Sequence, residues 1–143
     1  MRFFPSPDGQ HIAVQLTTDD LLLESLREVC RLADIQSGAI VAAFGALKYA
    51  HFHVAVTDTY PPQARFIKWL APLELCHASG VIADGEPHVH IMVSNEEKAL
   101  GGHLEEGTVV LYLCEIVIQR LDGMGLTRQP DEHGVGMLEA GTV

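Results

Sequence analysis

The chain has 143 residues, of which 48% are hydrophobic and 20% charged, and its formal net charge is −10. This balance is that of a folded domain, no apolar run is long enough to span a bilayer, and the acidic charge argues against non-specific binding to nucleic acid phosphates. The N-terminal residues lack the pattern of a signal peptide. Three cysteines without a C-x-x-C motif predict buried, reduced thiols. We therefore expect a cytoplasmic protein.

A short strand at residues 11–16 and an amphipathic helix are the first predicted elements. Apolar residues recur at helical spacing from Leu22 to Val29, with charged residues on the other faces. Thr18 has the side chain of a helix N-cap, and the two aspartates after it suit the positive end of a helix dipole. We predict a helix over residues 19–34 that covers one face of a sheet.

The chain from residue 37 onward reads as strands joined by tight turns. Asp84-Gly85 is a strong two-residue hairpin signal, and short turns favour antiparallel pairing. Residues 122–143 are Gly-rich and weakly patterned, so we expect a surface or partly flexible tail. Strands are predicted over residues 39–44, 49–57, 65–70, 73–82, 87–94, 99–104 and 108–121. Residues 1–143 are therefore predicted to be one α+β domain with a mainly antiparallel sheet and one major helix.

Many of these strands are apolar on both faces. Such strands are buried on both sides, by a helix, by closure of the sheet or by another subunit. For a chain of this size the third option matters, and we expect a homo-oligomer.

His88-Val89-His90 is the strongest candidate for chemistry. Residues i and i+2 of a strand share a face, so both imidazoles project to one side and Val89 to the other. The polar turn at residues 95–98 would return the chain and place His103 beside them, with Cβ atoms about 5 Å apart. Three imidazoles at this spacing can hold one divalent ion, and three protein ligands leave an open position, as in catalytic zinc sites. The alternative is that all three are surface or turn histidines.

Other polar residues are harder to assign. His51 and His53 form a second H-x-H motif, typical of a half-exposed strand, although one of them could line the same pocket. Glu115 shares a strand face with apolar residues, where a carboxylate needs a partner. It could contact a ligating histidine, be a fourth ligand or act as a catalytic acid or base, or it could form a salt bridge at a sheet edge or subunit interface. Arg65 and Lys68 are possible anion binders.

Five segments follow one another along the chain. They are Leu73-Glu74-Leu75, Ser79-Gly80-Val81-Ile82, Asp84-Gly85-Glu86-Pro87-His88-Val89-His90, Gly101-Gly102-His103-Leu104 and Glu115-Ile116-Val117-Ile118. Their content and order resemble the PPC domain (plants and prokaryotes conserved domain, DUF296), in its stand-alone prokaryotic form without an AT-hook. Residues 37–47 upstream and Leu126-Thr127-Arg128 downstream fit the same pattern.

The resemblance implies an α+β fold similar to that of acetolactate decarboxylase, and a homotrimer. It also implies that His88, His90 and His103 match the metal-binding histidines of the family, with zinc as the expected metal. Plant members carry the domain after basic AT-hooks, and prokaryotic members are often labelled DNA-binding by that association. This sequence has no Arg-Gly-Arg-Pro AT-hook, so direct DNA binding is not favoured.

Two functions fit these observations best. The first is a metal-binding, oligomeric domain that acts as a regulatory or interaction module through protein partners. The second is a small zinc-dependent lyase- or hydrolase-like enzyme that acts on a small carbonyl-containing acid. In that enzyme the metal would polarise the carbonyl, and Glu115 or a neighbouring histidine would move the proton.

Overall fold

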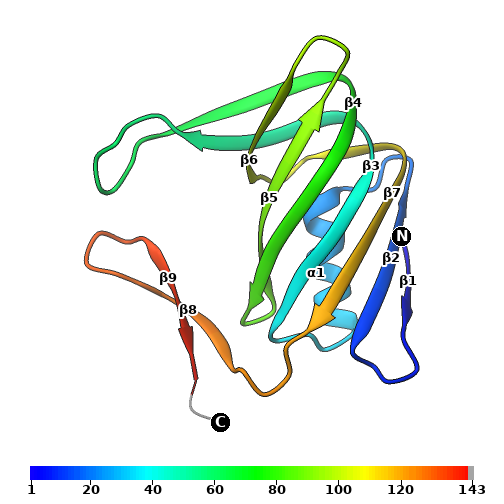
Figure 1. The fold of residues 1–143 in the computed structure, drawn as a ribbon, viewed down its shortest axis with the longest axis vertical. Helices are drawn as coiled ribbons and strands as arrows, with labels where there is room; N and C mark the ends of the chain where they lie inside the picture. The colour runs from blue at the N-terminus through cyan, green and yellow to red at the C-terminus, as the bar shows by residue number, and fades with distance from the viewer. Residues whose placement is uncertain (142–143) are drawn as a thin grey trace.

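The computed structural model describes residues 1–141, which contain one helix and nine strands. The predicted α+β class with a mainly antiparallel sheet is confirmed (Figure 1). The elements are β1 (Arg2–Pro5), β2 (His11–Thr17), α1 (Leu22–Leu32), β3 (Gly38–Ala55), β4 (Ala64–Ala83), β5 (Glu86–Ser94), β6 (Ala99–Leu104), β7 (Val109–Arg120), β8 (Leu126–Pro130) and β9 (Gly136–Ala140). No helix within residues 1–141 is long and apolar enough to cross a membrane.

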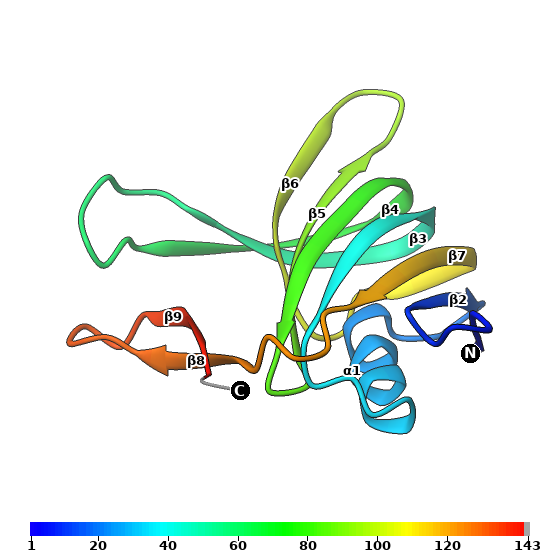
Figure 2. The ribbon, with the colours of Figure 1, turned by 60° about the horizontal axis from the view of Figure 1, so that its bottom comes forward.

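Seven strands form one antiparallel sheet in the order β1-β2-β7-β3-β4-β5-β6. Helix α1 packs beneath β2, β7 and β3 (Figure 2). Its apolar side chains, among them Leu22, Leu26 and Val29, are buried in one cluster with residues from both halves of the sheet. The amphipathic pattern thus places the helix against the sheet because burial of this stripe drives the packing.

The sheet curls until its last strand meets its centre. Besides pairing with β5, strand β6 pairs with β3 through Phe52↔Leu104 and His53↔His103. Gly102 permits this approach, because a Cβ atom there would lie 2.3 Å from the carbonyl oxygen of His53. The closure brings the distal part of β3 beside β6, which matters for the histidines described below.

Two pairs of predicted strands are each continuous. The stretches predicted at residues 39–44 and 49–57 both lie in β3, except that β3 ends at Ala55, and those at 65–70 and 73–82 both lie in β4. The pairing register of β3 with β4 shifts at one point, between Leu47 and Tyr49 of β3, which lies opposite Pro72 of β4. Irregularities of this kind accommodate a proline within a sheet. Beyond the shift, β3 and β4 extend as a long projecting arm (Figure 1).

The start of the helix differs from the prediction. Helix α1 runs from Leu22 to Leu32, and its N-cap is Leu21 rather than Thr18, without a side-chain capping bond. The carboxylate of Asp20 instead accepts the amide hydrogen of Thr17 at 2.8 Å, so these residues form a turn before the helix. The pattern predicts Thr18 as the N-cap and both aspartates in the first turn of the helix, but the structure places all three residues before the helix.

The cysteine prediction holds for two of the three residues. Cys30 and Cys114 are buried, and burial raises their thiol pKa values to about 11 and about 12 respectively. Cys76 is exposed on β4, contrary to the expectation, because it lies on the face of that strand turned away from the core. All three thiols are free.

Strands β8 and β9 pair as a hairpin that the weak pattern of residues 122–143 did not predict. The last two residues of that predicted tail lie outside the described residues. Leu126 is buried, its amide donates to Ser37 Oγ at 2.9 Å, and its carbonyl accepts from the amide of Asp84 at 3.0 Å. The base of the hairpin is therefore anchored to the body of the protein. Its turn contacts the projecting arm, where the Tyr60 hydroxyl donates to Asp131.

Candidate metal centre

Four histidines gather where β3, β5 and β6 meet. His88 and His90 lie on one face of β5, while Val89 between them is 1% exposed and faces the core, as predicted. His90 pairs with His103 across β5 and β6, and His103 pairs with His53 across β6 and β3. The ring centroid of His103 lies 4.6 Å from that of His88, 5.6 Å from that of His90 and 4.5 Å from that of His53. The three predicted histidines are thus brought together, and His53 joins them.

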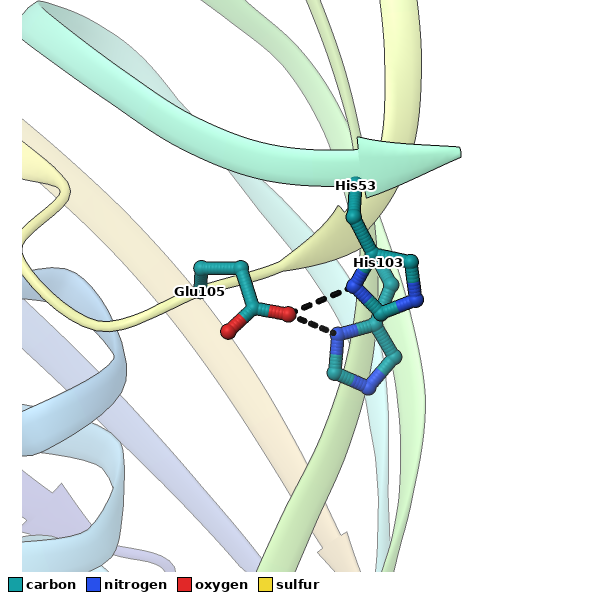
Figure 3. Close-up of side chains that lie close together, drawn as sticks. All are labelled: His53, His103 and Glu105. Atoms are coloured by element: carbon teal, nitrogen blue, oxygen red, sulfur yellow. Dashed lines mark hydrogen bonds and ion pairs between the residues drawn. The ribbon is translucent and has the colours of Figure 1, made fainter. Parts of the chain in front are cut away.

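Glu105 lies next to two of these rings (Figure 3). The Nδ1–H of His53 donates to Glu105 Oε1 at 2.6 Å, and Nδ1 of His103 lies 3.3 Å from the same oxygen. The second contact does not have hydrogen-bond geometry, so within residues 1–141 the buried Nδ1 of His103 has no hydrogen-bond partner. The ligand atoms of His53, His103 and Glu105 lie within 4.8 Å of one another. Within residues 1–141 this is the group close enough to share a metal ion in its present side-chain positions.

The cluster favours uncharged imidazoles. Burial lowers the pKa of His88 to about 4, helped by the nearby His103, Arg128 and His90. Burial and the neighbouring His53 also lower the pKa of His103, partly opposed by Glu105. Both rings are therefore neutral at pH 7, which is the form that ligates metal. Imidazole nitrogens with a nearby carboxylate are the donor set that zinc takes in proteins, so the residues present fit this ion.

A hollow of about 330 Å³ opens beside the cluster and is lined by His88, His103 and Glu105 together with two arginines. Arg27 Nε lies 2.7 Å from a carboxylate oxygen of Glu86, and its Nη1 lies 2.5 Å from one of Glu106. Arg128 reaches the hollow from β8. No sequence pattern indicated that either arginine lies here, because each comes from an element that is distant in the chain from the histidines.

The second H-x-H motif also belongs here. His53 is part of the cluster, and His51 lines the hollow with its Nδ1 at 2.9 Å from the backbone oxygen of Glu106. The interpretation in which one of them lines the same pocket was therefore the better one. Arg65 and Lys68 lie on the projecting arm and are not among the residues that line the hollow.

Glu115 lies elsewhere, so its expected place beside the histidines is corrected. Its side chain is exposed and lines a separate, mainly apolar hollow with Phe4, Phe44 and Val117. Strand periodicity correctly grouped Glu115 with its apolar neighbours on one face, but that face turns outward in the single chain. The carboxylate that does adjoin the histidines is Glu105, which the sequence analysis missed because it follows β6 in a turn.

The sequence matches the Plants and Prokaryotes Conserved (PCC) domain over residues 5–122. The chain therefore belongs to this family, as the resemblance implied. The match ends before Arg128. Among curated proteins, the Bifunctional protein GlmU of Synechococcus sp. (strain JA-3-3Ab) is 29% identical over 120 residues, which are 82% of this chain and 18% of that protein. The chain thus spans less than a fifth of the length of this relative.

Solved structures share the fold over nearly the whole chain. A protein of Ralstonia eutropha JMP134, described as a candidate DNA-binding protein, is 26% identical with a TM-score of 0.80, covering 97% of this chain and 96% of that one. A plant- and prokaryote-conserved (PPC) protein of Pyrococcus horikoshii is 25% identical with a TM-score of 0.79, covering 99% and 97%. A metal-containing protein of Archaeoglobus fulgidus is 22% identical with a TM-score of 0.78, covering 96% of each chain. The predicted PPC fold is confirmed.

Proposed function

We propose that this domain binds one divalent metal ion, zinc by preference, through His88, His90 and His103. The observation that carries the proposal is the convergence of His88 and His90 on His103, with ring centroids 4.6 and 5.6 Å from that of His103. A protein of the same fold is described as metal-containing, but that likeness is one of fold, and the proposal depends on the side chains. Nickel, copper and iron also accept imidazole, so zinc is the preferred rather than the sole candidate.

Glu105 would orient one of the proposed ligands, His103, whose Nδ1 lies 3.3 Å from Glu105 Oε1. A carboxylate that accepts the Nδ1–H of a histidine fixes its tautomer and leaves Nε2 free for a metal. In Figure 3 the second ring nitrogens of His53 and His103 point away from Glu105, which is compatible with this role. In the competing arrangement Glu105 and His53 would themselves be ligands together with His103, as their close spacing allows.

We further propose that the domain acts as an oligomeric regulatory or interaction module in the cytoplasm. Support comes from large apolar side chains in solvent on the sheet, namely Phe4, Phe44 and Tyr112, which are 47%, 53% and 61% exposed. A contiguous apolar surface of this kind is typical of a subunit interface, and a homotrimer would cover it. The three free thiols suit a reducing compartment. Direct DNA binding is disfavoured by the net charge of −10.

A small metalloenzyme is the second candidate, and the hollow beside the histidines favours it. Its volume of about 330 Å³ suits a small ligand. A bound metal would supply Lewis-acid polarisation of a substrate carbonyl. The residues placed to hold or transfer a proton are then His53 and Glu105, which are hydrogen-bonded to each other. Glu115 has no part in this version.

Elemental mass spectrometry of protein purified without a His-tag or nickel column tests the metal centre. We expect about one zinc per chain in the wild type and none in a His88→Ala/His103→Ala double variant, because two of three ligands are lost. A matched His11→Ala/His133→Ala variant, which alters histidines outside the cluster, should keep its zinc. If neither wild type nor added-zinc samples hold metal, the proposal fails.

A further inference from the structure

We infer that Arg128 is the anion-binding residue of the histidine-lined hollow, and that its ligand is the carboxylate of a small monocarboxylic acid. The inference rests on the metal centre proposed above and names the class of ligand that would bind beside it. It concerns a residue of strand β8, which comes from the opposite end of the chain from Arg27.

The two arginines of the hollow differ in their partners. Arg27 is neutralised, since it pairs with both Glu86 and Glu106. Arg128 has no carboxylate partner within the described part of the chain: its Nη1 donates to the backbone oxygen of Gly136 at the long distance of 3.5 Å, and its buried Nε has no partner at all. A buried N–H without an acceptor costs about 1–3 kcal/mol, more for a charged group. A ligand oxygen in the hollow would remove that cost.

The hairpin holds Arg128 in place. Residues two apart in a strand share a face, so Arg128 projects on the same side as the buried Leu126. Leu126 is fixed by its two backbone hydrogen bonds to Ser37 and Asp84. The guanidinium is thus presented from an anchored backbone, and a planar guanidinium binds a carboxylate through two parallel hydrogen bonds.

Charge selects a monoanion. The charged side chains that line the hollow are two arginines and three glutamates, Glu86, Glu105 and Glu106, whose formal charges sum to one net negative charge. A divalent ion would change this to one net positive charge, which a single carboxylate neutralises. A phosphate dianion would leave an excess of negative charge next to three carboxylates. The volume of about 330 Å³ also lies at the small end of ligand pockets.

Isothermal titration calorimetry with pyruvate as the probe tests the inference on zinc-loaded protein, with the zinc content of every sample measured first. Arg128→Gln should weaken pyruvate binding by about tenfold to a hundredfold, since a charge-assisted bidentate contact is lost. Arg128→Lys, which keeps the charge but loses the planar fork, should fall between Arg128→Gln and wild type. Arg65→Gln, on the projecting arm, should bind like wild type. Metal-free wild type should bind pyruvate more weakly than the loaded form, and inorganic phosphate should bind the loaded form more weakly than pyruvate does.

The outcomes separate this inference from the metal centre. Equal pyruvate affinity in wild type and both Arg128 variants, with one zinc per chain in each, overturns the role of Arg128 and leaves the metal centre standing. Tighter binding of phosphate than of pyruvate overturns the carboxylate as ligand. A chain that binds no zinc overturns the metal centre, and the inference with it. Thermal melts of Arg128→Gln and Arg128→Lys show whether each variant is folded, and the Lys variant decides if the Gln variant is not.

Discussion

Two hollows of this domain have opposite characters. The hollow of about 330 Å³ beside the histidines is lined mainly by histidines, arginines and glutamates. Its lining residues come from five elements, α1, β3, β5, β6 and β8, and from the turn after β6. The hollow of about 440 Å³ over β2, β7 and β3 is lined mainly by apolar side chains, with Glu115 as its charged member. Residues of both hollows were candidates for one site when the sequence alone was considered, His88 and His103 in the first hollow and Glu115 in the second.

The burial and the partners of the side chains distinguish a hollow suited to ligand binding from one suited to subunit association. Around the histidines, polar groups converge and shift one another's pKa values, as is common at functional sites. On the outer face, large apolar groups meet solvent and Glu115 has no ion-pair partner within residues 1–141. The first hollow is therefore suited to binding an ion and a small ligand, and the second to covering by another chain.

The largest effect is expected from Gly102→Ala. The added Cβ would lie 2.3 Å from the carbonyl oxygen of His53, so β6 cannot stay against β3. We expect the free energy of unfolding to fall by about 3 kcal/mol, and zinc binding to be lost with the closure. Urea denaturation and metal analysis measure both. Gly136→Ala, where a Cβ meets nothing within 4 Å, is the control and should change neither. If the Gly102→Ala protein keeps its zinc, the metal centre does not depend on the pairing of β6 with β3.

Glu105→Gln compares the two hollows directly with Glu115→Gln. Loss of the carboxylate beside His53 and His103 should weaken zinc binding by about tenfold to a hundredfold. Glu115→Gln should leave zinc affinity unchanged because that side chain lines the other hollow. Competition with a fluorescent zinc chelator measures both affinities. The assignment of the two carboxylates is reversed if only Glu115→Gln weakens binding.

Phe44→Glu tests the outer face. A charge placed among exposed apolar side chains should oppose subunit association, since burial of a phenylalanine contributes about 1.5–3 kcal/mol. We expect a lower association constant by sedimentation velocity, with zinc content unchanged. Leu32→Glu introduces the same charge at the end of α1, where Leu32 is 50% exposed, and should not alter assembly. If the association constant of Phe44→Glu equals that of the wild type, the subunit interface lies on another surface.

The smallest effect concerns pH in the metal-free protein. The pKa of His88 falls from 6.5 to about 4 in the folded chain. Between those values the unfolded chain binds a proton that the folded chain does not, so the free energy of unfolding should fall as the pH drops through this window. Urea unfolding at pH 7.5 and pH 5 should show a smaller decrease for His88→Gln than for wild type. Identical decreases would mean that His88 is not held in its neutral form.

Local sequence patterns predicted the features that residues close in the chain determine, namely turns, strand bounds and the face of a strand on which a side chain lies. The turn at Asp84-Gly85 is present, with φ of 52° and 74° at its two residues, and strand β6 has the predicted bounds. The shared face of His88 and His90 and the approach of His103 followed from strand periodicity and one hairpin. Their role as metal ligands stays a prediction.

Features that depend on distant pairing were missed. His53 reaches His103 only because β3 and β6 close the sheet, and Arg128 reaches the hollow only because Leu126 docks against Ser37 and Asp84. Periodicity told which residues share a face with Glu115, but not which side of the sheet faces the histidines. These are tertiary facts, set by register and sheet curvature rather than by local propensity.

The most direct test of the metal centre is an anomalous difference map at the zinc edge from crystals of zinc-loaded protein. We expect one peak per chain at about 2.0–2.1 Å from a ring nitrogen of each of His88, His90 and His103. A peak held by His53, His103 and Glu105 without His88 and His90 would contradict the proposed ligand set. No peak among the histidines at all would contradict the metal centre itself.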